Sequence, residues 1–266
     1  MSNCKAKLMA RKERKLKTLM GCALTLALLS GCANTPSEPV MAGDIQIHDP
    51  LENSNRTVFA FNNAVDKAVI HPVVKGYKKI VPEPARTGVD NVLRNLKSPV
   101  TFANQALQGD VKGAGTVLLR TVINTFVGLG GLFDVAGAEG LKYQPEDFGQ
   151  TLATWGVGHG PYIVVPVIGP SSLRDYAGYA VDSYADPLRW YLFNTDHEEI
   201  YYGKIGADYL SLRASLIDVL EDLEKSSIDY YAATRSAYYQ RREALVNDQD
   251  PETVQTAIPD YDEENL

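Results

Sequence analysis

The chain has 266 residues, of which 45% are hydrophobic and 22% charged, and its formal net charge is −7. This composition is typical of a folded protein with one good core or two small ones. The acidic balance excludes a nucleic-acid binder, which needs a basic face to neutralise phosphates.

The N-terminal segment has the organisation of an export signal. Seven basic residues precede an apolar run of 13 residues, Thr18 to Ser30. A membrane-spanning helix needs about 20 residues, so we expect a signal that is removed rather than a permanent anchor. A signal ending at residue 31 takes one acidic residue with it and leaves a net charge of −13.

The end of this signal, LSGC at residues 29–32, resembles a bacterial lipobox. In that motif the cysteine becomes the lipidated first residue of the mature protein, so we expect Cys32 to carry lipid. Ala33 stands where a lipoprotein retained in the inner membrane typically has Asp, which implies delivery to the outer membrane. Cys4 and Cys22 leave with the signal, so no internal disulfide is expected.

Composition also marks the limits of the folded part. Residues 33–47 are small, polar and interrupted by proline, as in a tether. From residue 248 onward the chain has seven acidic residues and no Lys or Arg, and such a self-repelling segment is expected to be disordered. We therefore predict a signal at 1–31, a lipidated tether at 32–47, one domain at 48–247 and an acidic tail at 248–266.

Helical periodicity dominates the predicted domain. Apolar residues recur every three or four positions from Asn55 onward, and Pro72 is expected to end this first helix. The same period continues in four later segments, which lie at 82–96, 110–126, 205–223 and 227–246. These patterns predict a mostly α-helical fold without an internal repeat.

One long segment lacks charge. From Phe148 to Leu173 there is no Asp, Glu, Lys or Arg, although the segment is rich in glycine and contains three prolines. The β-branched run 162–168 is the only plausible strand, and Pro166 restricts it to a sheet edge or a hairpin arm.

The sequence shows little sign of catalysis. GPSSL at 169–173 lacks the closing glycine of a nucleophile elbow, so Ser171 or Ser172 is expected to cap the next helix. Glu146 and Asp147 are expected to begin a helix, where acidic side chains suit the helix dipole.

Sites for nucleotides and metals are not predicted either. GLGGLF and GVGHG do not complete the GxGxxG pattern of a phosphate-binding loop. The four histidines have no second ligand at a metal-binding spacing. We expect no enzyme activity, no cofactor and no metal.

Charge is distributed unevenly along the chain. The net charge is +5 between residues 67 and 97 and −7 between residues 182 and 229. A solvated face is the simplest explanation, but a basic patch on a membrane-tethered domain also has a counter-charge in lipid phosphates. The candidate head-group contacts are Lys75, Lys78, Lys79 and Arg86.

Several long motifs, in order, resemble the VacJ/MlaA family of outer-membrane lipoproteins. The resemblance implies a ring-like bundle of amphipathic helices, embedded in one membrane leaflet around an amphipathic channel. The motifs are DPLENSNRTVFAFN (49–62), VPEPARTGVDNVLRNL (81–96), LQGD (107–110), NTFVGLGGLFDVA (124–136), EDFGQTLATWGVGHGPYIVVP (146–166) and GPSSLRD (169–175).

The same resemblance implies a function. A family member is expected to form a passive channel that removes mislocalised phospholipid from the outer leaflet and hands it to a periplasmic lipid-binding protein of the Mla system. It is lipid-anchored on the periplasmic side of the outer membrane and associates with trimeric porins. Two alternatives stay open from the residues alone, a structural lipoprotein that scaffolds porins and an envelope hydrolase that uses Ser171.

The resemblance gives the uncharged segment a role as a hairpin at the rim or wall of the channel. Its prolines prevent one continuous helix, so its backbone polar groups need partners in the protein or in a water-lined cavity. Gly156 and Gly158 correspond to hinge glycines of the family, although tight turns would explain them equally. The expected lipid-facing residues are Tyr162, Ile163, Val164, Val165, Val167 and Ile168.

The helix around Phe61 lies in a family region tied to channel control. Here the sequence reads FNNAV where some relatives carry an additional residue. No individual role is therefore assigned to Asn62 or Asn63.

Overall fold

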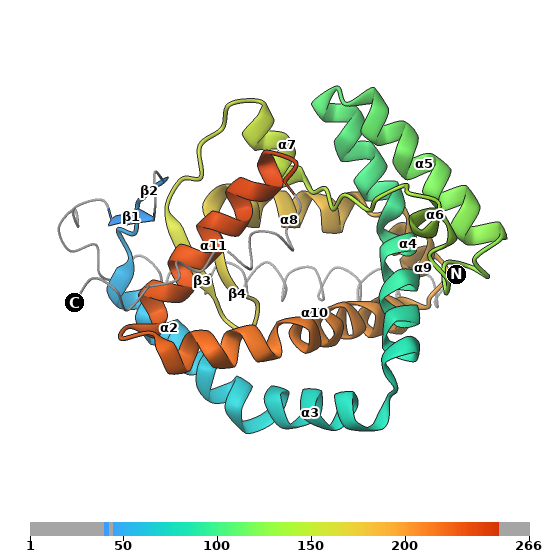
Figure 1. Ribbon diagram of the computed structural model, residues 1–266. Helices are drawn as coiled ribbons and strands as arrows, with labels where there is room; N and C mark the ends of the chain where they lie inside the picture. Colours follow the sequence, from blue (N-terminus) through green and yellow to red (C-terminus); the bar gives the residue numbers. More distant parts are fainter. Residues whose placement is uncertain (1–39, 43–44, 250–266) are drawn as a thin grey trace, which may run out of the picture.

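The computed structural model describes residues 40–42 and 45–249. The expected signal peptide, Cys32 and all but the start of the acidic tail lie outside the described residues. The described part consists of long helices, short connections and two small hairpins (Figure 1). The predicted mostly α-helical fold with a short Gly/Pro-rich hairpin is confirmed. Within the described ranges, no helix is both long and apolar enough to cross a membrane.

Four helices form a closed ring (Figure 1). They are α4 (Glu83–Gln108), α7 (Phe148–Thr154), α10 (Glu198–Ser226) and α11 (Tyr230–Val246). Each packs against the next, since α4 contacts α7, α7 contacts α11, α11 contacts α10, and α10 contacts α4. The ring-like arrangement expected from the resemblance is therefore present.

The other helices pack onto this ring. α5 (Val111–Phe126) lies along α4, and α6 (Val135–Ala138) contacts α5. α8 (Leu173–Ala185) packs on α7, and α9 (Pro187–Asn194) joins α8 to α10.

The first helix is longer than its sequence predicts. α2 (Glu52–Val65) passes through a π-helical turn, Asp66–Ile70, into α3 (His71–Ile80), so the expectation that Pro72 ends the helix was wrong. The His71 N–H donates to the carbonyl of Asp66, five residues back, at the end of this wider turn. Pro72 then lies in the first turn of α3, where a missing N–H is tolerated.

The second predicted helix also extends further, because α4 continues through Pro99 to Gln108. Gly109 ends it with a φ of 83°, the left-handed conformation that glycine adopts most readily. The helices predicted at 110–126, 205–223 and 227–246 are confirmed as α5, α10 and α11, although α11 begins only after its N-cap, Asp229.

Two antiparallel hairpins complete the fold. β3 (Tyr162–Val165) pairs with β4 (Gly169–Ser172), with Tyr162 opposite Ser172. β1 (Val40–Ala42) pairs with β2 (Ile45–Ile47). The expectation of a flexible tether up to residue 47 was therefore wrong at its C-terminal end, because Ile47 is buried in the main apolar cluster with Tyr162, Val164, Tyr231 and Tyr239.

Candidate functional site

The β3–β4 hairpin is fastened to α2 by two asparagines. Asn55 Nδ2 donates to the carbonyl of Tyr162 (3.0 Å), and the N–H of Val164 donates to Asn55 Oδ1 (2.9 Å). Asn62 makes the same pair of bonds to Val165 O (3.0 Å) and Val167 N (2.8 Å). Residues seven apart lie on one face of a helix, about two turns from each other. The side-chain amides of Asn55 and Asn62 thus pair with backbone N–H and C=O groups along the edge of the hairpin, as the backbone of a neighbouring strand would.

The second asparagine holds the hairpin at its strained point. Val167 has a φ of 69°, a conformation that costs a β-branched residue on the order of 1–3 kcal/mol. Its side chain is 52% exposed and that of Ile168 is 50% exposed. Asn62 therefore fixes an exposed, apolar and strained turn, a role that the sequence did not reveal.

The base of the hairpin is buried in tyrosines. The ring of Tyr162 lies 6.1 Å from that of Tyr231, 6.0 Å from that of Tyr238 and 5.9 Å from that of Tyr239, between centroids. Burial raises the pKa of Tyr162. The N–H of Ser172 donates to Tyr238 OH (2.9 Å), which ties β4 to α11.

The expected lipid-facing set must be corrected at two positions. Tyr162 is 0% exposed and Val164 is 4% exposed, because alternate residues of a strand point to the same face and this face packs on the core. Ile163 and Val165 point to the other face and are half-buried. The exposed turn residues Val167 and Ile168 remain candidates for lipid contact.

The two candidate hinge glycines differ in their geometry. Gly156 has a φ of 86° and follows α7, where its N–H donates to Ala153 O (2.8 Å) and the Val157 N–H donates to Leu152 O (2.9 Å). This is a Schellman cap, which favours glycine for a static reason. Gly158 has no positive φ, and a Cβ there would contact nothing within 4 Å. A hinge role for either glycine stays a prediction.

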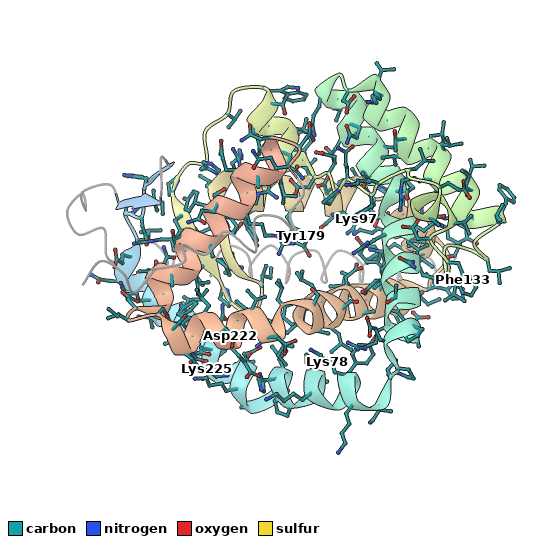
Figure 2. The ribbon with its side chains drawn as sticks, viewed as in Figure 1. Lys78, Lys97, Phe133, Tyr179, Asp222 and Lys225 are labelled. Atoms are coloured by element: carbon teal, nitrogen blue, oxygen red, sulfur yellow. The ribbon has the colours of Figure 1, made fainter. Side chains whose placement is uncertain are left out.

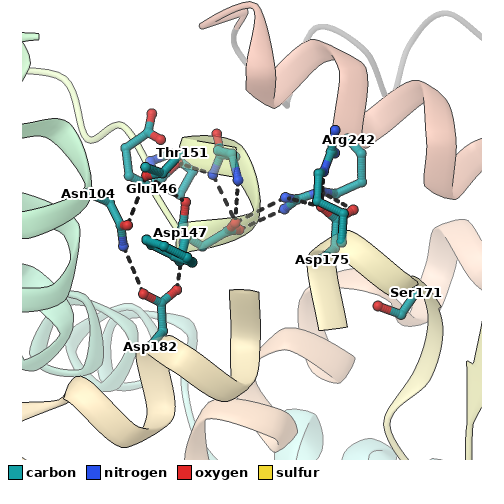
Figure 3. Close-up of polar contacts among 12 residues, drawn as sticks. Asn104, Glu146, Asp147, Thr151, Ser171, Asp175, Asp182 and Arg242 are labelled. Carbon is teal, nitrogen blue, oxygen red and sulfur yellow. Dashed lines mark hydrogen bonds and ion pairs between the residues drawn. The ribbon is translucent and has the colours of Figure 1, made fainter. Parts of the chain in front are cut away.

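A buried ionic network anchors the segment before the hairpin (Figure 3). Asp147 caps α7, as predicted, by accepting from the Gln150 N–H (3.0 Å), and Arg242 of α11 donates to both its oxygens (2.7 and 3.0 Å). Arg242 Nη2 also donates to Asp175 of α8 (3.0 Å). Burial opposes ionisation of Asp147, but its bonds with Arg242 hold the pKa of this carboxyl well below its usual range.

A second part of this network joins α4 to α7 and α8. Asp182 accepts from Asn104 Nδ2 (2.9 Å) and from the Phe148 N–H (2.8 Å), and Thr151 Oγ1 donates to Asn104 Oδ1 (2.9 Å). Glu146 accepts from Gln108 Nε2 (2.7 Å), yet burial raises the pKa of Glu146 to about 7. The polar groups at the start of α7 therefore connect three helices around the hairpin's base.

Ser171 hydrogen-bonds to the backbone in the described part of the chain. Its Oγ lies 3.2 Å from the carbonyl of Ser172, and among the described residues no histidine is recorded as its partner. Ser172 rather than Ser171 caps α8, since its Oγ accepts from the Asp175 N–H (3.1 Å). Within the described part of the chain, no group of three or more metal-ligating side chains is found.

The candidate head-group contacts fall into two groups. Lys75 and Lys78 are paired with α10, since Lys75 Nζ lies 3.1 Å from Glu221 Oε1 and Lys78 Nζ lies 2.8 Å from Asp218 Oδ2. The remaining two, the exposed Lys79 and the half-buried Arg86, have no ion pair recorded among the described residues. Three of the seven basic residues of 67–97, namely Lys67, Lys75 and Lys78, thus form ion pairs with acidic residues of 182–229. Contact with lipid head groups stays a prediction.

Large apolar side chains remain exposed on the periphery of the ring. On α5 and the loop after it, Phe126 is 80% exposed, and Leu118, Val122, Leu129 and Phe133 are also exposed. Figure 2 places Phe133 at the outer edge of the molecule. A patch of this kind usually marks contact with a membrane or a protein. The fold and the site together define the class of the protein, a helical ring with a clamped hairpin and an apolar periphery.

Comparisons with known proteins identify the family. A family model described as MlaA lipoprotein matches residues 47–245. The Intermembrane phospholipid transport system lipoprotein MlaA of Escherichia coli K12 is 36% identical over 86% of this chain and 88% of its own length. The protein of the same name from Haemophilus influenzae is 34% identical over 92% of this chain and 97% of its own. The chain therefore belongs to the MlaA lipoprotein family.

A solved structure agrees with this assignment. It comes from work on the "structural basis for maintenance of bacterial outer membrane lipid asymmetry", with a TM-score of 0.66 and 36% sequence identity. The match covers 75% of this chain and 99% of the solved one. The expected family resemblance is therefore confirmed in both sequence and fold.

Proposed function

We propose that this chain is an outer-membrane lipoprotein, anchored through Cys32 on the periplasmic side, that gives phospholipid a passive path out of the outer leaflet. A periplasmic lipid-binding protein of the Mla system would receive the lipid, so that the asymmetry of the membrane is maintained. The names of the relatives from E. coli and H. influenzae support this proposal. It involves no enzymatic step, no cofactor and no energy source within the chain.

The observation that carries the proposal is a closed helical ring with exposed apolar side chains around it. Exposed side chains such as Phe126 and Leu129 would lower their free energy by contact with acyl chains of the inner leaflet or with a trimeric porin. Such a ring would lie within one leaflet, because its helices are amphipathic.

Polar side chains lie toward the inside of the ring. Lys97 of α4 and Tyr179 of α8 lie toward the middle of the ring in Figure 2. Burial disfavours the charged form of Lys97, but Tyr143 and the carboxylates of Asp147, Asp182 and Asp208 raise its pKa. A phospholipid head group would pass this polar surface while its tails followed apolar side chains, since neither end of the lipid is stable in the other's environment.

The test is the amount of phospholipid in the outer leaflet of cells that lack the protein. We expect the amount to rise in the deletion and to return to normal with the wild-type chain. Complementation with Gly158→Pro should fail at an equal protein level if the hairpin has to move, whereas Gly158→Ala should succeed, because a Cβ at this position meets no neighbour.

Each alternative function predicts a different result. A lipoprotein that only scaffolds porins would leave outer-leaflet phospholipid unchanged in the deletion, which would overturn the transport proposal. A hydrolase would release lipid products from purified protein, and Ser171→Ala would abolish that release.

A further inference from the structure

A charged cavity lies between the π-helical turn, α3 and α10. Its volume is about 230 Å³, which is well above the roughly 10–15 Å³ that one water molecule needs. Lys225 of α10, labelled in Figure 2, lies at this junction with α3. The charged residues that line it are Asp66, Lys67, His71, Lys75, Arg213, Glu221, Glu224 and Lys225.

The cations of this cavity converge on one carboxylate. Glu221 lies 3.1 Å from Lys75 Nζ, 3.3 Å from Lys225 Nζ and 3.4 Å from His71 Nε2. Lys75 and Lys225 hold the pKa of Glu221 below its usual value. One carboxylate cannot neutralise several cations, so this end of the cavity keeps an excess of positive charge.

The other charged residues of the cavity are already paired. Arg213 makes two hydrogen bonds to Asp66 (2.8 and 2.7 Å), and Lys67 Nζ lies 2.5 Å from Glu224 Oε1. Counting one carboxylate for each cation, Asp66, Glu221 and Glu224 offset three of the four Lys and Arg residues. The cavity thus has nearly balanced charge with a surplus of about one cation when histidine is neutral.

The pairs formed by lysine can exchange partners at little cost. The side chains of Lys67, Lys75 and Lys225 are 58%, 59% and 69% exposed, and exposed lysines are mobile point charges. A phosphate oxygen could replace Glu221 as the acceptor of Lys75 and Lys225, and Glu224 as the acceptor of Lys67, without leaving any group buried and unpaired. Binding of an anion would therefore require no change in the helices.

A metal ion does not fit this cavity. Its lining has more cations than carboxylates, and a divalent cation would be repelled by the lysines that surround the only shared carboxylate. A ligand that carries both a negative and a positive group matches the lining better. Its phosphate would face the lysines, and its cation would face Glu224 and Glu221 once these are released from lysine.

We propose that this cavity binds a phosphodiester that also carries an ammonium group, as in a zwitterionic phospholipid head group. Lys75 and Lys225 contact the phosphate, and Glu221 and Glu224 contact the ammonium. The π-helical turn supports a binding role, since such turns occur frequently at functional sites. This inference rests on the proposed function and adds to it a binding point for the head group where α3 packs on α10.

The test measures binding to the mature protein in an uncharged, phosphate-free detergent by titration calorimetry. Three probes separate the sources of the phosphate: inorganic phosphate, glycerophosphoethanolamine and a short-chain phosphatidylethanolamine. The variant Lys75→Gln with Lys225→Gln removes both phosphate contacts. Lys78→Gln is the matched control, because Lys78 forms the same kind of ion pair between α3 and α10 but does not line the cavity.

We expect the double variant to bind glycerophosphoethanolamine and the short-chain lipid with an affinity lower by about tenfold or more. This loss corresponds to that of one charge-assisted hydrogen bond. Lys78→Gln should change the affinity by less than about twofold, since it touches neither charge of the ligand. Glu221→Gln should raise the affinity for inorganic phosphate, because a carboxylate that competes for the lysines is lost. The same variant should reduce the preference of the protein for the probes that carry an ammonium group. An unfolded variant would not produce these opposite changes.

Two results would overturn the inference: no saturable binding to the wild type, or equal losses in the double variant and in Lys78→Gln. Inorganic phosphate that binds as tightly as glycerophosphoethanolamine would also overturn it, by removing any role for the carboxylates. The proposed function fails separately, if deletion of the protein leaves outer-leaflet phospholipid unchanged whatever the cavity binds.

Discussion

The two sides of the molecule use charge in opposite ways. Around the hairpin, ion pairs are buried, and the side chains of Arg235 and Asp49 are each only 3% exposed. Where α3 packs on α10, the ion pairs are accessible to solvent, as in Lys78 and Asp218, whose side chains are 29% and 79% exposed. Buried ion pairs fix a single geometry, because separating the two partners leaves each charge buried with neither a counter-charge nor water to stabilise it. Open pairs hold the helices loosely, because water can replace either partner.

The first prediction concerns the buried ion pairs of Arg242. Arg242→Met leaves the buried carboxylate of Asp147 without its arginine, whereas Asp175 keeps its contact with Arg174. We therefore expect the free energy of unfolding to fall by about 3–5 kcal/mol. Thermal or denaturant unfolding in detergent measures this change. Arg241→Met is the control, because burial and the neighbouring Arg242 lower the pKa of Arg241 and no carboxylate bond is recorded for it in the described part. An equal loss in both variants would contradict the role given to the network.

The second prediction concerns the two asparagines of α2. Asn55→Leu leaves buried backbone groups of Tyr162 and Val164 unpaired and should cost about 2–4 kcal/mol. Asn62→Leu acts at the exposed turn, so we expect a smaller global loss of about 1 kcal/mol with faster amide hydrogen exchange at Val167. Hydrogen exchange that rises equally throughout the molecule in Asn62→Leu would exclude a local clamp.

The third prediction is a dependence on pH. The pKa of Glu146 is about 7 in the folded chain against an ordinary 4.5, so the folded state binds a proton that the unfolded state releases. Stability from this group is therefore present at low pH and is lost as the pH rises from about 4.5 to about 7. Glu146→Gln should remove this loss and raise stability at pH 8 by about 1–2 kcal/mol. Identical melting curves of the wild type and Glu146→Gln at every pH from 5 to 8 would refute the predicted effect of Glu146.

The fourth prediction concerns the open side and has the smallest effect. Lys78→Gln should lower the free energy of unfolding by no more than about 1 kcal/mol, because the Asp218 carboxylate stays in water. High salt should reduce the difference further by screening the wild-type pair. A loss of unfolding free energy as large as that in Arg242→Met would mean that the ion pairs between α3 and α10 are as important for stability as the buried network.

Local signals in the sequence were sufficient where a residue acts on its own neighbours. Asp147 was expected to begin a helix and does so through the N–H three residues later, as Ser172 does for α8. Pro72 misled because a π-helical turn before it carries the chain from α2 into α3, which packs against α10. The existence and type of the long helices therefore followed from periodicity, whereas the continuation past Pro72 and the extension of α4 to Gln108 did not.

Partners distant in the sequence could not be predicted. Asn62 lies 103 residues from the carbonyl it holds, and Lys78 lies 140 residues from Asp218. The paired asparagines of α2 left one signal, two amides at a helical spacing of seven, but nothing indicated the strand they would meet. Likewise, the opposite charge runs were visible, but their meeting along α3 and α10 required the fold.

The ring of four helices also has a consequence for how the chain is made. Two of its members, α10 and α11, are the last helices of the described part of the chain, and they supply the contacts with α4 and α7 that close it. A polypeptide that has emerged only as far as α9 is an open arc with its inner surface uncovered. Closure must therefore wait until α10 and α11 have been synthesised, and a premature stop codon in α10 gives an incomplete arc rather than a smaller ring. A chaperone that shields the arc until these two helices arrive would meet the same need in every copy of the protein.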